Sequence, residues 1–337
     1  MTSDTHSPLT ITHNPMTGSY ALTICGIVHN ELFFLEEFLA YYRRLGADRF
    51  IILDDRSTDG TREFLETQLD VMVLGSDVRY SQQIEYAPEF RSRIMETRAV
   101  RLWRDQIMNQ FCTGMWAVAV DADEFLALPE GMSLTGLTKE LEREGCEAVW
   151  GCMVDMYPEN VNDILGIPDT ARFRFDADWY FDARPLLKFR DGEKTPKTIY
   201  PGSTARLLST YHVLAQGSLV MRLRRRLTGY RYEPHKVIHK TPIVFWRKGD
   251  YFLNCHQTSK QPSRTRIIPI MHFKFTSDLG RKIEYAISSG SYSRGSANYR
   301  LYCDLIETMR ARGGRFISGI SHRYRSYGDF LETGIAR

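Results

Sequence analysis

The sequence lacks the features that mark several classes of protein. Its six cysteines form no C-x-x-C pair, so neither a zinc finger nor a dithiol redox motif is expected, and we interpret them as reduced. No window approaches the roughly 20 apolar residues that a membrane-spanning helix needs. Residues 1–19 lack the basic start and apolar stretch of a secretory signal. We therefore expect a disordered leader at 1–19 and a cytoplasmic, bacterial protein, with peripheral contact to the inner membrane as an open alternative.

An excess of charge of one sign is also absent. The 337 residues include 44 Lys and Arg against 41 Asp and Glu, which argues against nucleic-acid binding along an extended surface. One dense basic run, at 222–226, alternates with leucines, and the favoured interpretation is a strand with one solvated face rather than a membrane- or phosphate-facing patch. With 43% apolar and 25% charged residues, the chain has the composition of a globular protein with a large core.

Apolar runs typical of strands alternate with amphipathic runs typical of helices in the first half of the chain. This pattern predicts an α/β fold with a mostly parallel central sheet and helices on both faces, Rossmann-like in architecture. The expected strands are Ala21–Val28, Phe50–Leu53, Val71–Leu74, Trp116–Val120 and Ala148–Met153, and the expected helices are Leu32–Leu45, Thr61–Gln68 and Phe90–Met108.

From about Asp155 the pattern changes to short strands separated by turn residues, which predicts an antiparallel extension. These strands are expected at Pro185–Arg190, Ala205–Ser209, Val220–Leu223, Val237–Trp246 and Ile267–Phe275, and helices return at Leu279–Ser288 and Ala297–Met309. We divide the chain into one main domain at 20–275 and a C-terminal helical extension at 276–337. The main domain has a nucleotide-binding half at 20–126 and an acceptor and metal half at 127–275.

The strongest chemical signal is the acidic cluster Asp121-Ala122-Asp123-Glu124, directly after the strand Trp116–Val120. Ligands of open α/β sheets gather beyond the carboxyl ends of the strands, which is where this cluster falls. Alternate carboxylates there can bind a divalent metal, Mn²⁺ or Mg²⁺, together with substrate phosphates. Such a cation would stabilise the charge on a departing nucleoside diphosphate.

A second acidic pair, Asp54 and Asp55, follows another apolar strand and opens the loop D-D-R-S-T-D-G-T. Capping of the next helix explains Thr58 and Asp59. It does not explain two adjacent carboxylates, which repel each other unless a base, a ribose hydroxyl or a cation engages them.

These motifs together resemble the family 2 glycosyltransferases, a family with the GT-A fold, and most closely a bacterial subgroup with the signature N-E … D-x-D-E-F-L. The resemblance is carried by Cys25–Glu31, Glu36, Leu45-Gly46, the D-D-R-S-T-D-G-T loop and V-D-A-D-E-F-L, and more loosely by Lys236–Val244, His256 and Met271–Phe275. It implies transfer of a sugar, generally with inversion, from a nucleotide-diphosphate sugar such as a UDP- or GDP-sugar. The expected acceptor is a hydroxyl of a glycan or of a lipid-linked acceptor.

The resemblance also implies roles for residues of this chain. The segment from Ile27 to Glu31, which includes Val28 and Asn30, would contact the nucleobase and ribose together with Asp55, and Asp121 and Asp123 would bridge metal and diphosphate. For Glu31, stabilisation of the helix that begins there is an equally good explanation.

A third cluster, His272-Phe273-Lys274-Phe275, ends an apolar run. Strand alternation puts His272 and Lys274 on one face. We expect His272 to complete the metal site next to Asp123, and Lys274 to point into the same cleft and meet the diphosphate. His256 is the competing metal ligand.

The catalytic base is the least defined element of the sequence. An inverting transfer needs a carboxylate within hydrogen-bond reach of the acceptor hydroxyl. Asp155 is our choice because it follows a strand and precedes a turn, and the alternatives are Glu159, Asp178 and Asp182. The aromatic run at 179–181 is either a sugar-stacking platform or, more commonly for such clusters, part of the core.

Two other functions compete with glycosyl transfer. A nucleotidyltransferase would also bind a nucleotide and a metal, but it usually begins with a Gly-rich loop containing a basic residue, which the first strand here lacks. An inactive nucleotide-sugar-binding scaffold would not need both Asp121 and Asp123.

Overall fold

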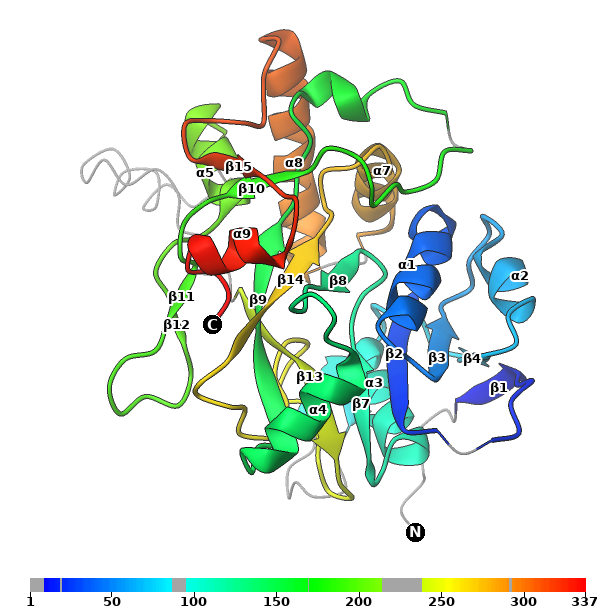
Figure 1. Cartoon of the computed structure of the whole chain (residues 1–337). Coiled ribbons are helices and arrows are strands. Elements are labelled where there is room, and N and C mark those ends of the chain that lie inside the picture. Colours follow the sequence, from blue (N-terminus) through cyan, green and yellow to red (C-terminus); the bar gives the residue numbers. More distant parts are fainter. Residues whose placement is uncertain (1–8, 19, 87–94, 169, 214–237, 291–292) are drawn as a thin grey trace.

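The computed structural model describes residues 9–18, 20–86, 95–168, 170–213, 238–290 and 293–337 (Figure 1). The strands are β1 Thr10–His13, β2 Leu22–Val28, β3 Arg49–Asp54, β4 Val71–Gly75, β5 Gln83–Tyr86, β6 Met95–Arg98, β7 Met115–Ala119, β8 Glu124–Leu126, β9 Ala148–Asp155, β10 Tyr180–Asp182, β11 Leu187–Lys188, β12 Lys197–Thr198, β13 His239–Trp246, β14 Ile267–His272 and β15 Ser321–Arg323. The helices are α1 Leu32–Arg44, α2 Thr61–Glu66, α3 Ala99–Phe111, α4 Leu134–Arg143, the 3₁₀ helix η1 Val161–Ile164, α5 Ser203–Thr210, α7 Leu279–Ser289, α8 Ser293–Ala311 and α9 Tyr327–Glu332.

A nine-stranded sheet with the order β1-β4-β3-β2-β7-β13-β9-β14-β8 organises the molecule. The strands β4, β3, β2 and β7 pair in parallel, and β9 pairs in parallel with β14. The antiparallel strand β13 joins these two groups, and it pairs with β7 on one side and β9 on the other. The predicted α/β fold with a mostly parallel central sheet is therefore confirmed.

Helices cover both faces of this sheet, because each strand of the parallel group is apolar on both sides. The side chains of β3 are buried along its whole length. One core joins alternate residues of β2 and β3 to α1, α2, α4 and α9, while a second core joins the opposite residues to α3. Figure 1 shows α1 and α4 in front of the sheet and α3 behind it.

Several local predictions were wrong. The expected disordered leader contains β1, which pairs antiparallel with β4 at the sheet edge. The expected strand Ala205–Ser209 is part of the helix α5. The helix predicted from Phe90 begins at Ala99, after the strand β6. The predicted strand Val220–Leu223 and the basic run at 222–226 lie outside the described residues.

The C-terminal part is tied into the main sheet. β15 pairs with β10, and the last residue, Arg337, exchanges two backbone hydrogen bonds with Ile267 at the start of β14. A third core joins α5, α7, α8 and η1. The part beyond residue 275, predicted as a C-terminal helical extension, contains α7, α8 and α9 and also contacts the main sheet.

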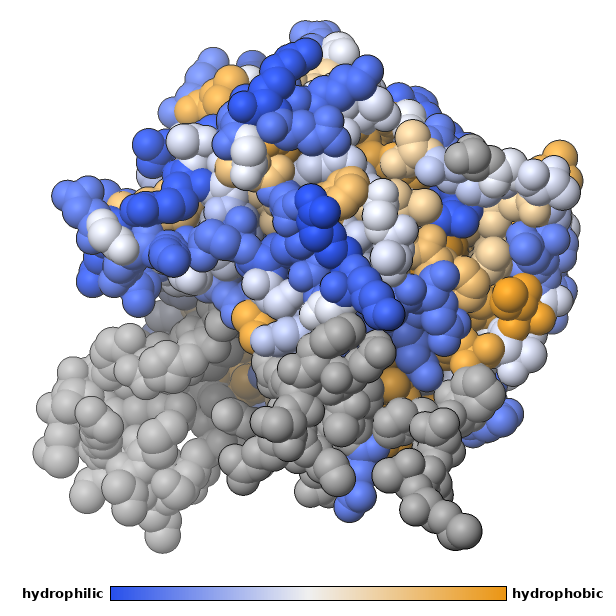
Figure 2. All heavy atoms as spheres, turned by 90° about the horizontal axis from the view of Figure 1, so that it is seen from below, coloured by the Kyte–Doolittle hydropathy of each residue, from blue (hydrophilic) through white to orange (hydrophobic). Residues whose placement is uncertain are grey.

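Within the described part of the chain, no helix is long and apolar enough to cross a membrane. Figure 2 shows the molecule from below, and on that face hydrophobic residues form small groups among hydrophilic ones. The expected peripheral membrane contact stays a prediction.

Candidate active site

The strands β2 and β3 end at Val28 and Asp54, and β7 ends just before Asp121, so the three carboxyl ends meet at one edge of the sheet. A cavity of about 200 Å³ opens there. It is lined by Ile27, Val28, His29, Glu31, Asp55, Tyr80, Asp121, Ala122, Asp123, His272, Lys282, Tyr285 and Tyr299. Four carboxylates and one lysine thus share the lining. The lining as a whole contains six of the ten predicted site residues, which are Val28, Glu31, Asp55, Asp121, Asp123 and His272.

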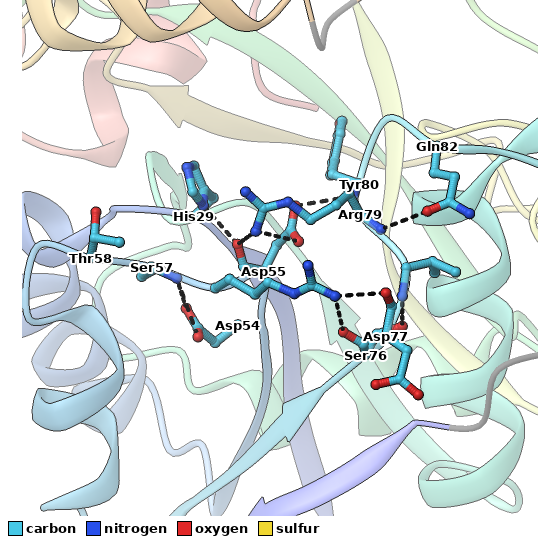
Figure 3. A network of polar contacts seen from close by, with 12 residues as sticks. His29, Asp54, Asp55, Ser57, Thr58, Ser76, Asp77, Arg79, Tyr80 and Gln82 are labelled. Carbon is cyan, nitrogen blue, oxygen red and sulfur yellow. Dashed lines mark hydrogen bonds and ion pairs between the residues drawn. The ribbon is translucent and has the colours of Figure 1, made fainter.

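Asp55 lies at one end of the cavity with its side chain only 4% exposed. Its Oδ2 accepts a hydrogen bond from the backbone N–H of Tyr80 at 3.0 Å, and Arg79 lies 3.7 Å from Oδ1 (Figure 3). Burial raises the pKa of Asp55, although the Tyr80 N–H and the Arg79 charge oppose this shift. Oδ1 accepts no hydrogen bond from the described residues, and a buried acceptor of this kind favours a ligand that donates one.

Asp54, in contrast, has no part in the cavity. Its carboxylate is fully buried, contacts Arg62 at 2.9 Å, and accepts a hydrogen bond from the Ser57 N–H at 3.2 Å. The prediction that Asp54 binds the nucleotide is therefore wrong. The side chain holds the loop after β3 in the shape that presents Asp55.

Asn30 is likewise a connector rather than a ligand contact. It has a positive φ of 56°, which asparagine tolerates better than most residues. Its N–H donates to Ser57 Oγ at 2.8 Å, and its Oδ1 accepts from the Thr58 N–H at 2.7 Å. Asn30 therefore connects the loops that follow β2 and β3 and does not line the cavity. Val28, the other residue predicted from this segment, does line it.

Asp121 faces the cavity with 44% of its side chain exposed. Arg104 from α3 contacts Oδ1 at 2.9 Å, and Lys240 from β13 lies 3.5 Å from Oδ2. Desolvation opposes ionisation, but the charges of Lys240 and Arg104 outweigh it and hold the pKa of Asp121 well below its usual range. Asp121 is therefore a fixed negative charge.

Glu124, the fourth residue of the acidic motif, points away from the cavity. It is buried, its Oε2 contacts Lys240 Nζ at 2.5 Å, and the same oxygen accepts the Asp121 backbone N–H at 3.0 Å. Burial raises the pKa of Glu124, against the Lys240 charge. Its role is to fix the loop that carries Asp121. Lys240 was not among the predicted site residues, although a lysine inside the apolar strand β13 indicates a buried partner.

Asp123 and His272 come together as expected. The Nε2 of His272 lies 3.7 Å from Asp123 Oδ2, although about 150 residues separate them in sequence. The antiparallel pairing of β14 with β8, which places His272 opposite Glu124, brings the ring to the acidic loop. The Phe273 N–H also donates to the Asp123 carbonyl at 2.9 Å.

The residues fit a divalent cation as a partial site. Among the described residues, no group of three His, Cys, Asp or Glu side chains is arranged to hold a metal by itself. The separation of 3.7 Å between Asp123 Oδ2 and His272 Nε2 can be bridged by an ion about 2.1 Å from each. Mg²⁺ and Mn²⁺ commonly take their remaining ligands from substrate phosphates and water, so two protein donors are compatible with such a site.

Lys274 and Asp155 do not line the cavity. The Lys274 ammonium lies 3.1 Å from Asp155 Oδ1 instead of facing Asp123. Asp155 Oδ1 also contacts His272 Nδ1 at 2.9 Å, and its Oδ2 accepts a hydrogen bond from Thr204 at 2.5 Å. Both oxygens of Asp155 are thus engaged within the chain. Neither side chain faces the cavity, which differs from the placement expected for Asp155 as the base and for Lys274 as a diphosphate contact.

The cavity lysine is Lys282, from α7. Its Nζ lies 3.0 Å from Glu31 Oε2 and 3.6 Å from Asp123 Oδ2. Burial raises the pKa of Glu31 above its usual range, against the Lys282 charge, and the carboxylates Asp123 and Asp278 raise it further. The same three carboxylates raise the pKa of Lys282 despite its burial. Glu31 therefore forms an ion pair with Lys282. Its side chain makes no capping hydrogen bond to α1, which was the alternative explanation for this residue.

The other candidates lie away from the cavity. Glu159 and Asp178 form ion pairs with Arg315 and Arg323, and Asp182 is 3% exposed next to Arg206. The aromatic run at 179–181 is core, with Trp179 and Phe181 buried. His256 is not among the lining residues, although its charge contributes to lowering the pKa of Asp121. The aromatic rings that do line the cavity are those of His29, Tyr80, Tyr285 and Tyr299.

Comparison with known proteins adds little to this geometry. No family model matches the chain, and no curated protein matches it. Among the solved structures that match is a UDP-glucose pyrophosphorylase from Acinetobacter baumanii, with 11% identity, a TM-score of 0.27, and coverage of 85% of this chain and 100% of that one. Because this TM-score is so low, we infer the fold from the strand order and the function from the residues of the site.

Proposed function

We propose that this protein is a glycosyltransferase that moves a sugar from a nucleotide-diphosphate sugar to an acceptor hydroxyl. One observation carries the proposal: Asp55, Asp121 and Asp123, which follow two strands on either side of β2, face a single cavity together with His272 and Lys282. This arrangement offers acceptors for a nucleoside at one end and a metal and phosphate position at the other.

The nucleoside end is the part around Asp55. A buried carboxylate oxygen without a hydrogen-bond donor suits a base N–H or a ribose hydroxyl. The rings of His29 and Tyr285, whose centroids lie 4.5 Å apart, offer an aromatic surface in the same cavity as Asp55. Asp55 would then fix the nucleoside, and the diphosphate would extend towards Asp123.

The phosphate end is the part around Lys282 and Asp123. An anionic diphosphate would meet four carboxylates and one ammonium in the lining, so its binding calls for a further cation. Mn²⁺ or Mg²⁺, held by Asp123 and His272, would supply Lewis-acid stabilisation of the leaving diphosphate. Lys282 would contribute a fixed positive charge aimed at the same group.

The acceptor hydroxyl must lose a proton as the new bond forms. Of the lining carboxylates, Asp55 and Asp121 are engaged by Tyr80 and Arg104, and Asp123 faces His272. Glu31 is engaged as well, by Lys282 at 3.0 Å, but burial raises its pKa, and a carboxylate with a raised pKa accepts a proton more readily. We therefore place the proton acceptor at Glu31 rather than at Asp155.

A screen of nucleoside diphosphates and their sugars, with and without Mn²⁺, tests the proposal. A ligand at 100 times its Kd stabilises the folded state by about 2.7 kcal/mol, which a thermal-shift measurement detects. We expect UDP or GDP to stabilise the protein much more strongly with Mn²⁺ than without it, and the matching nucleotide sugar to yield the free diphosphate when a glycan or lipid-linked acceptor is present. Release of pyrophosphate from a nucleoside triphosphate and a sugar phosphate would instead establish a nucleotidyltransferase. Binding of the nucleotide sugar without turnover over a broad acceptor panel would favour the scaffold.

A further inference from the structure

The side chain of Asp155 is held from three directions. Asp155 ends β9, and the parallel register of β9 with β14 places it directly beside His272. Thr204, near the start of α5, donates to Oδ2 at 2.5 Å, and Lys274 lies 3.1 Å from Oδ1. The carboxylate is only 10% exposed. A side chain with so little freedom can impose a geometry on its neighbour.

That neighbour is the ring of His272. A carboxylate can only accept hydrogen bonds, so the contact of 2.9 Å from His272 Nδ1 to Asp155 Oδ1 requires the proton on Nδ1. In the neutral ring, Nε2 then carries a lone pair, and Nε2 is the atom 3.7 Å from Asp123 Oδ2. The contact thus selects the tautomer that can bind a cation.

We propose that Asp155 is a positioning residue for the metal ligand His272, which it holds with Nε2 directed at Asp123, and that Thr204 and Lys274 hold Asp155 in turn. The inference rests on the proposed metal-dependent transfer. It gives Lys274 and Asp155 a shared task, and it accounts for a buried carboxylate, lysine and threonine just outside the cavity. Partners of this kind commonly change metal affinity by about 10–100-fold when they are removed.

The first test examines the ring without metal or nucleotide. Nitrogen NMR of protein labelled at histidine should show His272 protonated at Nδ1 and not at Nε2 at pH 8. In Asp155→Ala we expect the proton on Nε2 or a mixture of tautomers. An unprotonated Nδ1 in the wild type, or an unchanged tautomer in Asp155→Ala, would overturn the inference.

The second test measures Mn²⁺ binding by electron paramagnetic resonance in the presence of the nucleoside diphosphate that binds the wild type. Asp155→Ala should weaken Mn²⁺ binding about 10–100-fold, and Asp155→Asn, which can still accept from Nδ1, should restore part of the affinity. Thr204→Val should have a smaller effect. Binding of the nucleotide without Mn²⁺ should remain unchanged in all three.

Asp250→Ala is the matched control, because Asp250 is 13% exposed and also pairs with a lysine, Lys260, at 2.9 Å. It should leave Mn²⁺ affinity unchanged. If Asp155→Ala abolishes turnover with normal Mn²⁺ affinity, Asp155 is the base and the inference fails. If the wild type binds no Mn²⁺ with any nucleotide, the metal-dependent function fails, and the NMR result alone decides whether Asp155 sets the ring.

Discussion

Two aspartates, Asp121 from the first half of the chain and Asp182 from the second, lie in opposite environments. In the first half, Asp121 keeps 44% of its side chain exposed to the cavity while two cations hold it from behind. In the second half, Asp182 is 3% exposed. It is enclosed by Arg206 and by the hydroxyls of Tyr157 and Tyr200, both 2.6 Å away.

Asp121 therefore remains accessible to a ligand, whereas the oxygens of Asp182 already accept hydrogen bonds from residues of the chain. Both kinds follow short apolar strands, so the local sequence looks alike. The number of internal donors around a carboxylate, rather than its place after a strand, therefore indicates a functional role.

The largest effect is expected at Asp123. Asp123→Ala should lower glycosyl transfer by at least about 10³-fold, because it removes charge stabilisation at the leaving group. Nucleotide-dependent binding of Mn²⁺ should be lost, while the melting temperature of the free protein changes little. Steady-state kinetics and Mn²⁺ titration provide the measurements. Full activity in this variant, or in excess chelator, would contradict the metal-dependent mechanism.

Asp182→Ala should do the reverse and destabilise the fold. The change leaves Arg206, which is 13% exposed, without its carboxylate, and loss of one partner of a buried pair costs about 3–5 kcal/mol. Denaturant unfolding should show this loss, whereas kcat per folded molecule should stay near the wild-type value at low temperature. Asp182→Asn, which keeps acceptors for the two tyrosines, should be milder. A stable but inactive Asp182→Ala would contradict the assignment of Asp182 to a structural role.

Lys282 tests whether the C-terminal part belongs to the site. Lys282→Ala should lower kcat by about 10²-fold, since the ammonium meets charge that develops as the diphosphate leaves. It should also weaken nucleoside diphosphate binding in the absence of metal, whereas Lys274→Ala should not. The two variants compared by calorimetry settle which lysine faces the phosphates. Equal effects would restore the expectation that both lysines point into the cleft.

The sequence was informative where the relevant residues are close together in the chain. Parallel strands end at one edge, so an acidic pair directly after a strand must lie there, and Asp55, Asp121 and Asp123 all do. His272 was predicted as well, from strand alternation and from the family resemblance, and the antiparallel pairing of β14 with β8 brings it to the acidic loop.

The other residues depend on tertiary packing that no local pattern contains. Lys282 enters the cavity through the placement of α7, and Lys240 reaches Asp121 and Glu124 from β13, which pairs with β7. Asn30 was assigned to the nucleotide through the family resemblance, but its side-chain oxygen accepts a hydrogen bond from the neighbouring loop. The short apolar run at 205–209 fits a strand or a helix equally well by periodicity, so Thr204 was overlooked.

The smallest effect is expected at Asp55, which tests the nucleoside end of the cavity. Contacts to a base or ribose are made equally in the ground and transition states, so Asp55→Ala should raise KM for the donor about 10-fold and leave kcat nearly unchanged. Asp54→Ala is the informative neighbour, because the buried contact with Arg62 makes it a stability variant rather than a binding variant. Donor titrations and unfolding curves for both variants separate the two roles. A large fall in kcat with unchanged KM for Asp55→Ala would show that this carboxylate acts on the reacting group and not on the nucleoside. The nucleoside would then have to bind elsewhere in the cavity.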